Sequence, residues 1–119
     1  MKKTVVIGAS VNPDRYANKA VRKLKSYGHE VVAVGLRGGE IDGVKIHTDR
    51  PREENVHTVT MYVGEKNQPP LYDYIFSLKP QRIIFNPGAE NTELEQMAKE
   101  KGVEVLEACT LVLLSIGGY

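Results

Sequence analysis

The segment from Gly8 to Tyr16 carries the residues best suited to bind a phosphate group. Gly8 ends a short β-branched run and allows a close turn of the main chain, and Ser10 offers a hydroxyl donor. The first N–H groups of a helix that begins after this segment have no partner inside the helix and attract an anion. The pattern predicts a phosphate loop, with a plain tight turn built on Asn12-Pro13 as the other interpretation.

A dinucleotide-binding loop requires further glycines that this segment lacks. In the Gly-x-Gly-x-x-Gly fingerprint that starts at Gly8, the second and third glycine positions hold Ser10 and Pro13. After the second apolar run, the segment Val34-Gly35-Leu36-Arg37 has no carboxylate for the ribose hydroxyls of NAD. Arg37 instead brings a planar cation suited to a phosphate. The ligand is therefore expected to carry a phosphorylated ribose, as NADP and coenzyme A (CoA) both do.

No residue pattern predicts catalysis or metal binding. The histidines have neither the order of a catalytic triad nor the spacing of metal ligands: His29, His47 and His57. Glu90 and Glu93 lie where negative charge stabilises the start of a helix. Cys109 is the only cysteine, so it forms no internal disulfide and indicates a reducing cytosol. A free cysteine is most often buried, which favours an inert structural role.

Alternating strands and helices must position these residues. Continuous apolar runs predict strands over Thr4–Gly8, Glu30–Val34, His57–Val63, Arg82–Asn86 and Val103–Leu106, with a further short run over Val44–Ile46. Helical stripes run from Ala17 to Tyr27 before Gly28, from Pro69-Pro70 to just before Pro80, and over Asn91–Lys101. Thr92 and Glu95 have the spacing of a capping box at the start of the last helix, and Gly102 ends it.

This order of elements predicts an α/β fold. Continuous apolar strands separated by helices are typical of a parallel sheet that is covered on both faces. We expect a Rossmann-like, doubly wound, mostly parallel five-stranded sheet. Ligands of such sheets bind beyond the carboxyl ends of the strands. Those ends are expected after Ile7, Val34, Val63, Asn86 and Leu106.

Length and charge limit the partners that we expect. A chain of 119 residues predicts a single domain over residues 1–119. The 16 basic and 15 acidic residues give a net charge of +1, so neither nucleic acid nor an anionic membrane is an expected partner. No export signal precedes the first strand, which favours a cytoplasmic protein. The apolar run Leu111–Ile116 either closes the core or covers a partner, which leaves a homo-oligomer or a complex with another subunit open.

Three groups of residues resemble the motifs of a known family. They are Val6-Ile7-Gly8-Ala9-Ser10 with Asn12-Pro13, Tyr16 and Asn18; Gly28-His29-Glu30-Val31 with Val34; and Pro87-Gly88-Ala89-Glu90-Asn91 with Glu107-Ala108-Cys109-Thr110. In this order they resemble the small single-domain CoA-binding protein family. That family is related to the CoA-binding N-terminal domain of the succinyl-CoA synthetase α subunit. The resemblance covers essentially the whole chain.

The resemblance implies a set of ligand contacts. Gly8, Ser10 and the start of the first helix would hold the CoA pyrophosphate, Arg37 would face the ribose 3′-phosphate, and Val63 and Gly64 would border the adenine. The complete set of expected contacts is Gly8, Ala9, Ser10, Asn12, Pro13, Tyr16, Asn18, Lys19, Arg37, Val63, Gly64, Pro87 and Gly88. Asn86 and Asn91 are further candidates. Many family members read Val-Asn-Pro where this chain has Val34-Gly35-Leu36, so Arg37 is the charge left for the second phosphate contact.

The expected function is to bind CoA or an acyl-CoA, without a catalytic residue of its own. Two alternatives are a small NADP-dependent reductase and a non-catalytic nucleotide-binding subunit of a larger complex. Tyr62 and Tyr72 could stack on a purine, whereas Tyr74 lies on a predicted core stripe. A further hypothesis is that Cys109 forms a mixed disulfide with the thiol of CoA.

Overall fold

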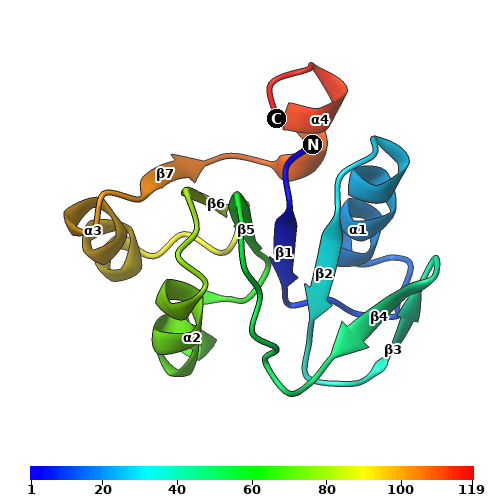
Figure 1. Cartoon of the computed structure of the whole chain (residues 1–119), viewed down its shortest axis with the longest axis horizontal. Coiled ribbons are helices and arrows are strands. Elements are labelled where there is room, and N and C mark those ends of the chain that lie inside the picture. Colours follow the sequence, from blue (N-terminus) through cyan, green and yellow to red (C-terminus); the bar gives the residue numbers. More distant parts are fainter.

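The chain forms seven strands and four α-helices (Figure 1). The computed structural model describes residues 1–119. The strands are β1 (Thr4–Ile7), β2 (Val31–Val34), β3 (Gly39–Ile41), β4 (Val44–His47), β5 (Thr58–Met61), β6 (Arg82–Phe85) and β7 (Glu104–Glu107). The helices are α1 (Tyr16–Ser26), α2 (Tyr72–Ser77), α3 (Thr92–Glu100) and α4 (Thr110–Ser115), with two 3-10 turns, η1 (Glu65–Asn67) and η2 (Pro69–Leu71), before α2.

The strands form one sheet in the order β3-β4-β2-β1-β5-β6-β7. Every neighbouring pair is parallel except β3 and β4, which are antiparallel. The predicted α/β class and mostly parallel sheet are confirmed. Because β2, β1, β5, β6 and β7 run in the same direction, their carboxyl ends meet at one edge, called the carboxyl edge below. Their starting ends define the amino edge.

The sequence predicts five strands, whereas the sheet has seven. The additional pair is the hairpin of β3 and β4, of which the sequence analysis noted only the short apolar run Val44–Ile46, now part of β4. β3 lies in a glycine-rich polar segment and buries one apolar side chain, Ile41. Asp42 and Gly43 join the two strands with φ values of 48° and 83°. An Asp-Gly pair in this conformation is a typical two-residue hairpin turn, so the dipeptide was the overlooked signal.

Successive strand residues alternate between two cores, one on each face of the sheet. Val5 of β1 lies in a core with side chains of α2 and α3. Its neighbour Val6 lies in the opposite core with side chains of α1 and α4. Helices therefore cover both faces, as Figure 1 shows. This double cover explains why the four residues of β1, of β5 and of β6 are all buried.

Two helix starts differ from the prediction. Asn91, not Thr92, caps α3: its Oδ1 accepts a hydrogen bond from Leu94 N at 3.1 Å, and its own N–H donates to Glu95 Oε2 at 3.2 Å. Asn is as good an N-cap as Thr, and its place one residue earlier fixes the helix start. Pro69-Pro70 lies in η2 rather than in the first turn of α2, which begins at Tyr72.

The apolar run near the C-terminus forms a helix that the sequence reading left unassigned. α4 packs along α1 and buries Leu114 in the core. Val112 and Ile116 remain 54% and 72% exposed. The run thus closes the core with part of its residues. No helix in the structure combines the length and the hydropathy that crossing a membrane requires.

Candidate functional site

The loop after β1 is packed against the ends of both neighbouring strands. Gly8 adopts a φ of +101°, and the N–H groups of Gly8 and Ala9 both donate to Val34 O at 2.9 Å. A Cβ atom on Gly8 would lie 3.0 Å from the main-chain carbon of Tyr62. A Cβ atom on Gly35 would lie 2.4 Å from Ala9 O. Neither position has room for a side chain, so both glycines are required for this close approach of main chains.

This loop leads into a helix start that no side chain caps. Arg15 is the N-cap residue of α1 and makes no side-chain cap hydrogen bond, and the first turn contains no acidic residue. Ser10 Oγ accepts from Asn12 N at 3.1 Å, and Asn12 Oδ1 accepts from Asp14 N at 3.0 Å, so both side chains shape the loop before the helix. The start of α1 keeps its positive partial charge and its free N–H groups, which suit an anion.

The side chains along the first turn of α1 divide into inner and outer groups. Asn18 is 1% exposed; its Nδ2 donates to Ser10 O at 2.8 Å, and its Oδ1 accepts from Arg22 Nε at 2.9 Å. Asn18 therefore fixes the loop from inside. Tyr16 and Lys19 point to solvent, with Lys19 Nζ 5.2 Å from the centroid of the Tyr16 ring. The sequence grouped these three residues together, and the structure separates their roles.

The loop after β2 presents one unpaired cation. Gly35 N donates to His47 O at 2.9 Å, which ties the start of this loop to β4. Leu36 is fully exposed, and Arg37 is exposed beside it. The salt bridges of the molecule involve other basic residues, namely Lys3, Lys25 and His47. Arg37 is thus free to bind an anion.

A buried amide joins the loops that follow β5 and β6. Gln68 is 0% exposed, and its Nε2 donates to Val63 O and to Ala89 O, both at 2.8 Å. Its Oε1 accepts from Asn91 Nδ2 at 2.8 Å. These contacts tie the loop that contains Val63 and Gly64 to the loop that contains Pro87 and Gly88. The sequence analysis missed Gln68, because a polar residue before two prolines gives no signal of burial.

Asn86 organises a second polar network at the end of β6. Its Nδ2 donates to Thr60 Oγ1 at 2.7 Å and to Met61 O at 2.9 Å, and its Oδ1 accepts from Thr110 N at 2.8 Å. Asn86 and Asn91 are both 2% exposed. The side chains of both asparagines therefore bond to groups inside the protein. They can affect a ligand only by fixing the conformation of their loops.

The remaining reactive candidates lie beside this network. Cys109 is partly buried and precedes α4 at the carboxyl edge. The hydroxyl of Tyr62 is buried without a hydrogen-bond partner, and burial raises its pKa. The hydroxyl of Tyr72 accepts from Asn91 Nδ2 at 2.8 Å and donates to Glu93 Oε1 at 2.9 Å. The hydroxyl of Tyr74 donates to Pro51 O at 2.8 Å, away from these loops, and burial raises its pKa to about 12.

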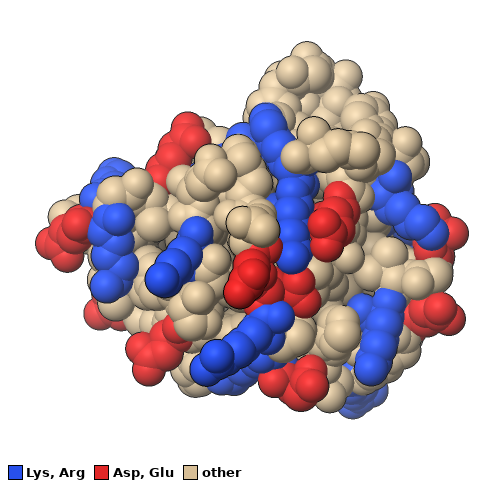
Figure 2. All heavy atoms as spheres, in the orientation of Figure 1, with Lys and Arg blue, Asp and Glu red and all other residues tan.

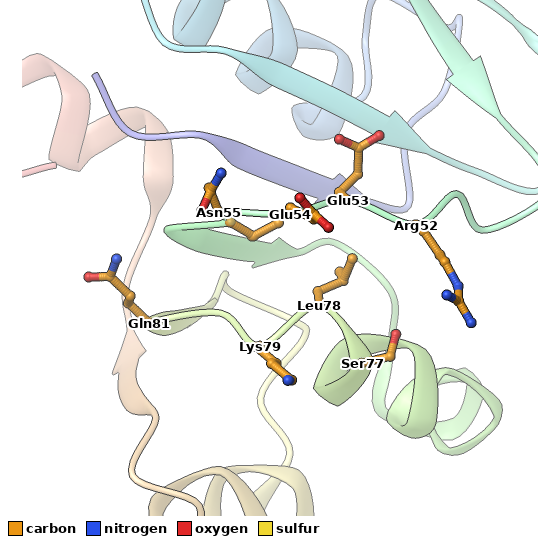
Figure 3. A pocket seen from close by; sticks show the side chains of 9 residues that line it. Arg52, Glu53, Glu54, Asn55, Ser77, Leu78, Lys79 and Gln81 are labelled. Carbon is orange, nitrogen blue, oxygen red and sulfur yellow. The ribbon is translucent and has the colours of Figure 1, made fainter.

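One hollow lies at the opposite, amino edge of the sheet. Its volume is about 790 Å³, and it is lined by the segment 52–56 before β5 and by residues 77–79 and 81 after α2 (Figure 3). Both signs of charge line it, and Glu53 already pairs with Lys3 at 2.8 Å. Figure 2 likewise shows basic and acidic side chains interspersed on that view of the molecule. The free helix start and the unpaired Arg37, which suit an anion, lie elsewhere, at the carboxyl edge.

The comparisons with known proteins agree with the motifs. A family model described as a CoA binding domain matches residues 2–115. The chain belongs to this CoA-binding domain family. The resemblance drawn from the motifs is therefore confirmed, and the family supports CoA binding in general. A search of the curated proteins finds no match.

Several solved structures resemble this CoA-binding domain. The crystal structure of an uncharacterized protein is 50% identical, with a TM-score of 0.98, over 100% of this chain and 98% of that chain. A conserved hypothetical protein from Pyrococcus furiosus is 28% identical, with a TM-score of 0.76, over 89% and 92% of the two chains. A dinucleotide-forming acetyl-coenzyme A synthetase from Ca. Korarchaeum cryptofilum is 21% identical, with a TM-score of 0.70, over 89% of this chain and 25% of that one. This last likeness shows a shared fold.

Proposed function

We propose that this CoA-binding domain binds CoA or an acyl-CoA at the carboxyl edge of its sheet, as a single Rossmann-like domain. The observation that carries the proposal is the loop from Gly8 to Ser10 leading into the uncapped start of α1. The sheet order supports it, because the chain winds outward from β1 in both directions and places that loop where the winding reverses. Ligands of doubly wound sheets bind at this point.

The proposed pyrophosphate site uses main-chain N–H groups more than side chains. Gly8, Ala9 and Ser10 would lie against the pyrophosphate, and the first N–H groups of α1 would donate to its oxygens. Asn12 and Pro13 shape the turn, and Asn18 holds Ser10 from inside. Lys19 and Tyr16 lie on the outer side of the turn, where the Lys19 ammonium would add a mobile positive charge.

The remaining contacts flank this centre. Arg37, which is exposed and unpaired after β2, would bind the ribose 3′-phosphate through its planar guanidinium. Val63 and Gly64, after β5, would border the adenine. Pro87 and Gly88, after β6, would meet the pantetheine side of the ligand. The matched family favours CoA over NADP for this set of contacts. The proposal assigns binding to the chain and no chemical step.

Calorimetric titration with CoA, dephospho-CoA, NADPH and NADH tests the proposal. CoA should bind most tightly, and dephospho-CoA should bind more weakly because it lacks the phosphate that Arg37 would contact. Binding of NADPH without binding of CoA would contradict the proposal. Equal affinity for CoA and dephospho-CoA would contradict the role of Arg37 while leaving CoA binding intact.

A further inference from the structure

The side chain of Gln68 joins the loops after β5 and β6 through three hydrogen bonds. Its amide donates to one carbonyl in each loop, Val63 O and Ala89 O, at 2.8 Å each. Both donors and the acceptor of this fully buried side chain are engaged with groups of these loops. A buried amide satisfied in this way fixes the separation of the groups that it joins.

The bridge continues to helix α3 through Asn91. Asn91 Nδ2 donates to Gln68 Oε1 and to the hydroxyl of Tyr72, both at 2.8 Å, while Asn91 Oδ1 caps α3 through Leu94 N at 3.1 Å. One asparagine therefore connects the start of α3 to Gln68. The loop after β6 is therefore held at both of its ends. Asn86 hydrogen-bonds to Thr60 of β5 at one end, and Asn91 hydrogen-bonds to Gln68 at the other.

We propose that Gln68 is a positioning residue of the ligand site, which holds the loops after β5 and β6 as one preformed surface. The identity of the ligand rests on the proposed function, whereas the coupling of the loops rests on the hydrogen bonds alone. Val63 and Gly64 lie on one side of the bridge, and Pro87 and Gly88 lie on the other. A ligand that spans both loops gains affinity when their separation is fixed before binding.

Gln68→Met removes all three hydrogen bonds at nearly constant volume and tests the proposal. In the free protein, amide hydrogen exchange should become faster in segments 62–68 and 86–91, and not in β1 or α1. The affinity for CoA should fall by at least about fivefold, because the binding surface is no longer preformed. Asn91→Ser is the second variant, since serine keeps a helix cap but loses the donor to Gln68. It should show the same pattern with a smaller effect.

Two controls separate positioning from a general loss of stability. Gln96→Met makes the same substitution at an exposed position on α3 and should change neither exchange nor affinity. Val56→Ala lowers stability at the amino edge, in the segment before β5, and should leave CoA affinity at the wild-type value. Wild-type affinity in folded Gln68→Met, or an exchange pattern like that of Val56→Ala, would overturn the inference.

The same experiment distinguishes failure of the inference from failure of the proposed function. If the wild-type protein binds no CoA, the proposed function fails, and the exchange pattern of the free variants decides the inference. Faster exchange confined to the two loops would then support Gln68 as the bridge between them. If Gln68→Met does not fold, Asn91→Ser decides by the same two measurements.

Discussion

The two edges of the sheet use their polar groups in opposite ways. At the carboxyl edge, side chains such as Asn18, Gln68 and Asn86 bond to loop main chain and hold it in place, while a helix start and Arg37 are left without protein partners. At the amino edge, charged and aromatic groups bond to one another. The carboxyl edge therefore leaves hydrogen-bond donors free, whereas the donors named below at the amino edge bond to other protein groups.

Tyr119 closes the amino edge. The residue is 8% exposed, its hydroxyl hydrogen-bonds to Thr4 Oγ1, and its ring centroid lies 4.4 Å from Arg82 Cζ and 5.0 Å from the centroid of His29. Arg82 is 6% exposed and donates through Nε to Thr58 Oγ1 at 2.7 Å. Lys2 Nζ donates to the main-chain oxygen of Tyr119. Arg82 and Lys2 therefore already have partners inside the protein.

The size of a hollow does not by itself decide between the two edges. The hollow of about 790 Å³ lies at the amino edge, where Lys3 pairs with Glu53 and this carboxylate raises the pKa of Lys3. The carboxyl edge offers a free helix start and Arg37. An anion needs unpaired donors more than it needs enclosed volume, so the carboxyl edge is the better candidate.

Gly35→Ala should have the largest effect on the carboxyl edge. The added Cβ would lie 2.4 Å from Ala9 O, so either the phosphate loop or the end of β2 must shift. We expect a loss of about 2–3 kcal/mol in the free energy of unfolding and a loss of more than about tenfold in CoA affinity. Urea denaturation and calorimetry would measure both.

Gly38→Ala is the matched control for this change. Gly38 lies three residues later, and a Cβ there would meet nothing within 4 Å. Both quantities should stay near their wild-type values. A Gly35→Ala protein that binds CoA normally would show that the close approach of β2 to the loop is unrelated to binding.

Arg82→Leu, at the amino edge, should lower stability without changing CoA affinity. It removes the charged hydrogen bond to Thr58 Oγ1, which keeps His57 Nδ1 as its partner, and the contact with the Tyr119 ring. We expect the free energy of unfolding to fall by about 2 kcal/mol. CoA affinity, measured where the variant is fully folded, should not change. A clear loss of affinity would mean that the two edges are coupled through the sheet.

At the carboxyl edge, the sequence predicted the strands and helices better than it predicted the roles of individual residues. The strand–helix order and Gly8 were readable because apolar periodicity and glycine carry local signals. Gln68 was different, because its importance comes from burial against Ala89 and Asn91, which are 21 and 23 residues away in the chain. A polar residue gives the same local signal whether it faces solvent or bridges two loops.

The amino edge was almost invisible in the sequence. Arg82 reads as the first residue of a strand and Tyr119 as the end of an apolar run, and 37 residues separate them. Strand β3 was missed for another reason. It buries only Ile41, so no period-2 pattern forms, and the Asp42-Gly43 turn was the one signal available.

Arg37→Ala should have a moderate effect that is confined to one part of the ligand. If the guanidinium binds the 3′-phosphate of CoA, its loss should cost about 1.5 kcal/mol, or roughly tenfold in affinity. Dephospho-CoA should bind the variant and the wild type equally, and stability should not change because Arg37 is exposed. Titrations at two salt concentrations would measure it, since the difference between the ligands should shrink as salt rises. Equal losses for both ligands would assign Arg37 to another contact.

The smallest effect concerns pH and should be confined to the amino edge. Burial, reinforced by nearby positive charges that include Lys2 and Arg82, lowers the pKa of His29 below 6.5, and Lys2 N donates to its unprotonated Nδ1 at 2.9 Å. A group whose pKa is lower in the folded protein stabilises it fully above its unfolded pKa. That contribution is lost as the pH falls through 6.5 toward the folded value.

The urea midpoint should therefore decrease slightly between pH 7.5 and pH 5.5. His29→Asn should reduce the decrease, and His57 should account for part of the remainder, because burial and Arg82 lower its pKa as well. A profile that His29→Asn does not alter would place the acid sensitivity outside the contacts of Tyr119. The closure of the amino edge would then depend on Arg82 and Thr4 rather than on the neutral imidazole.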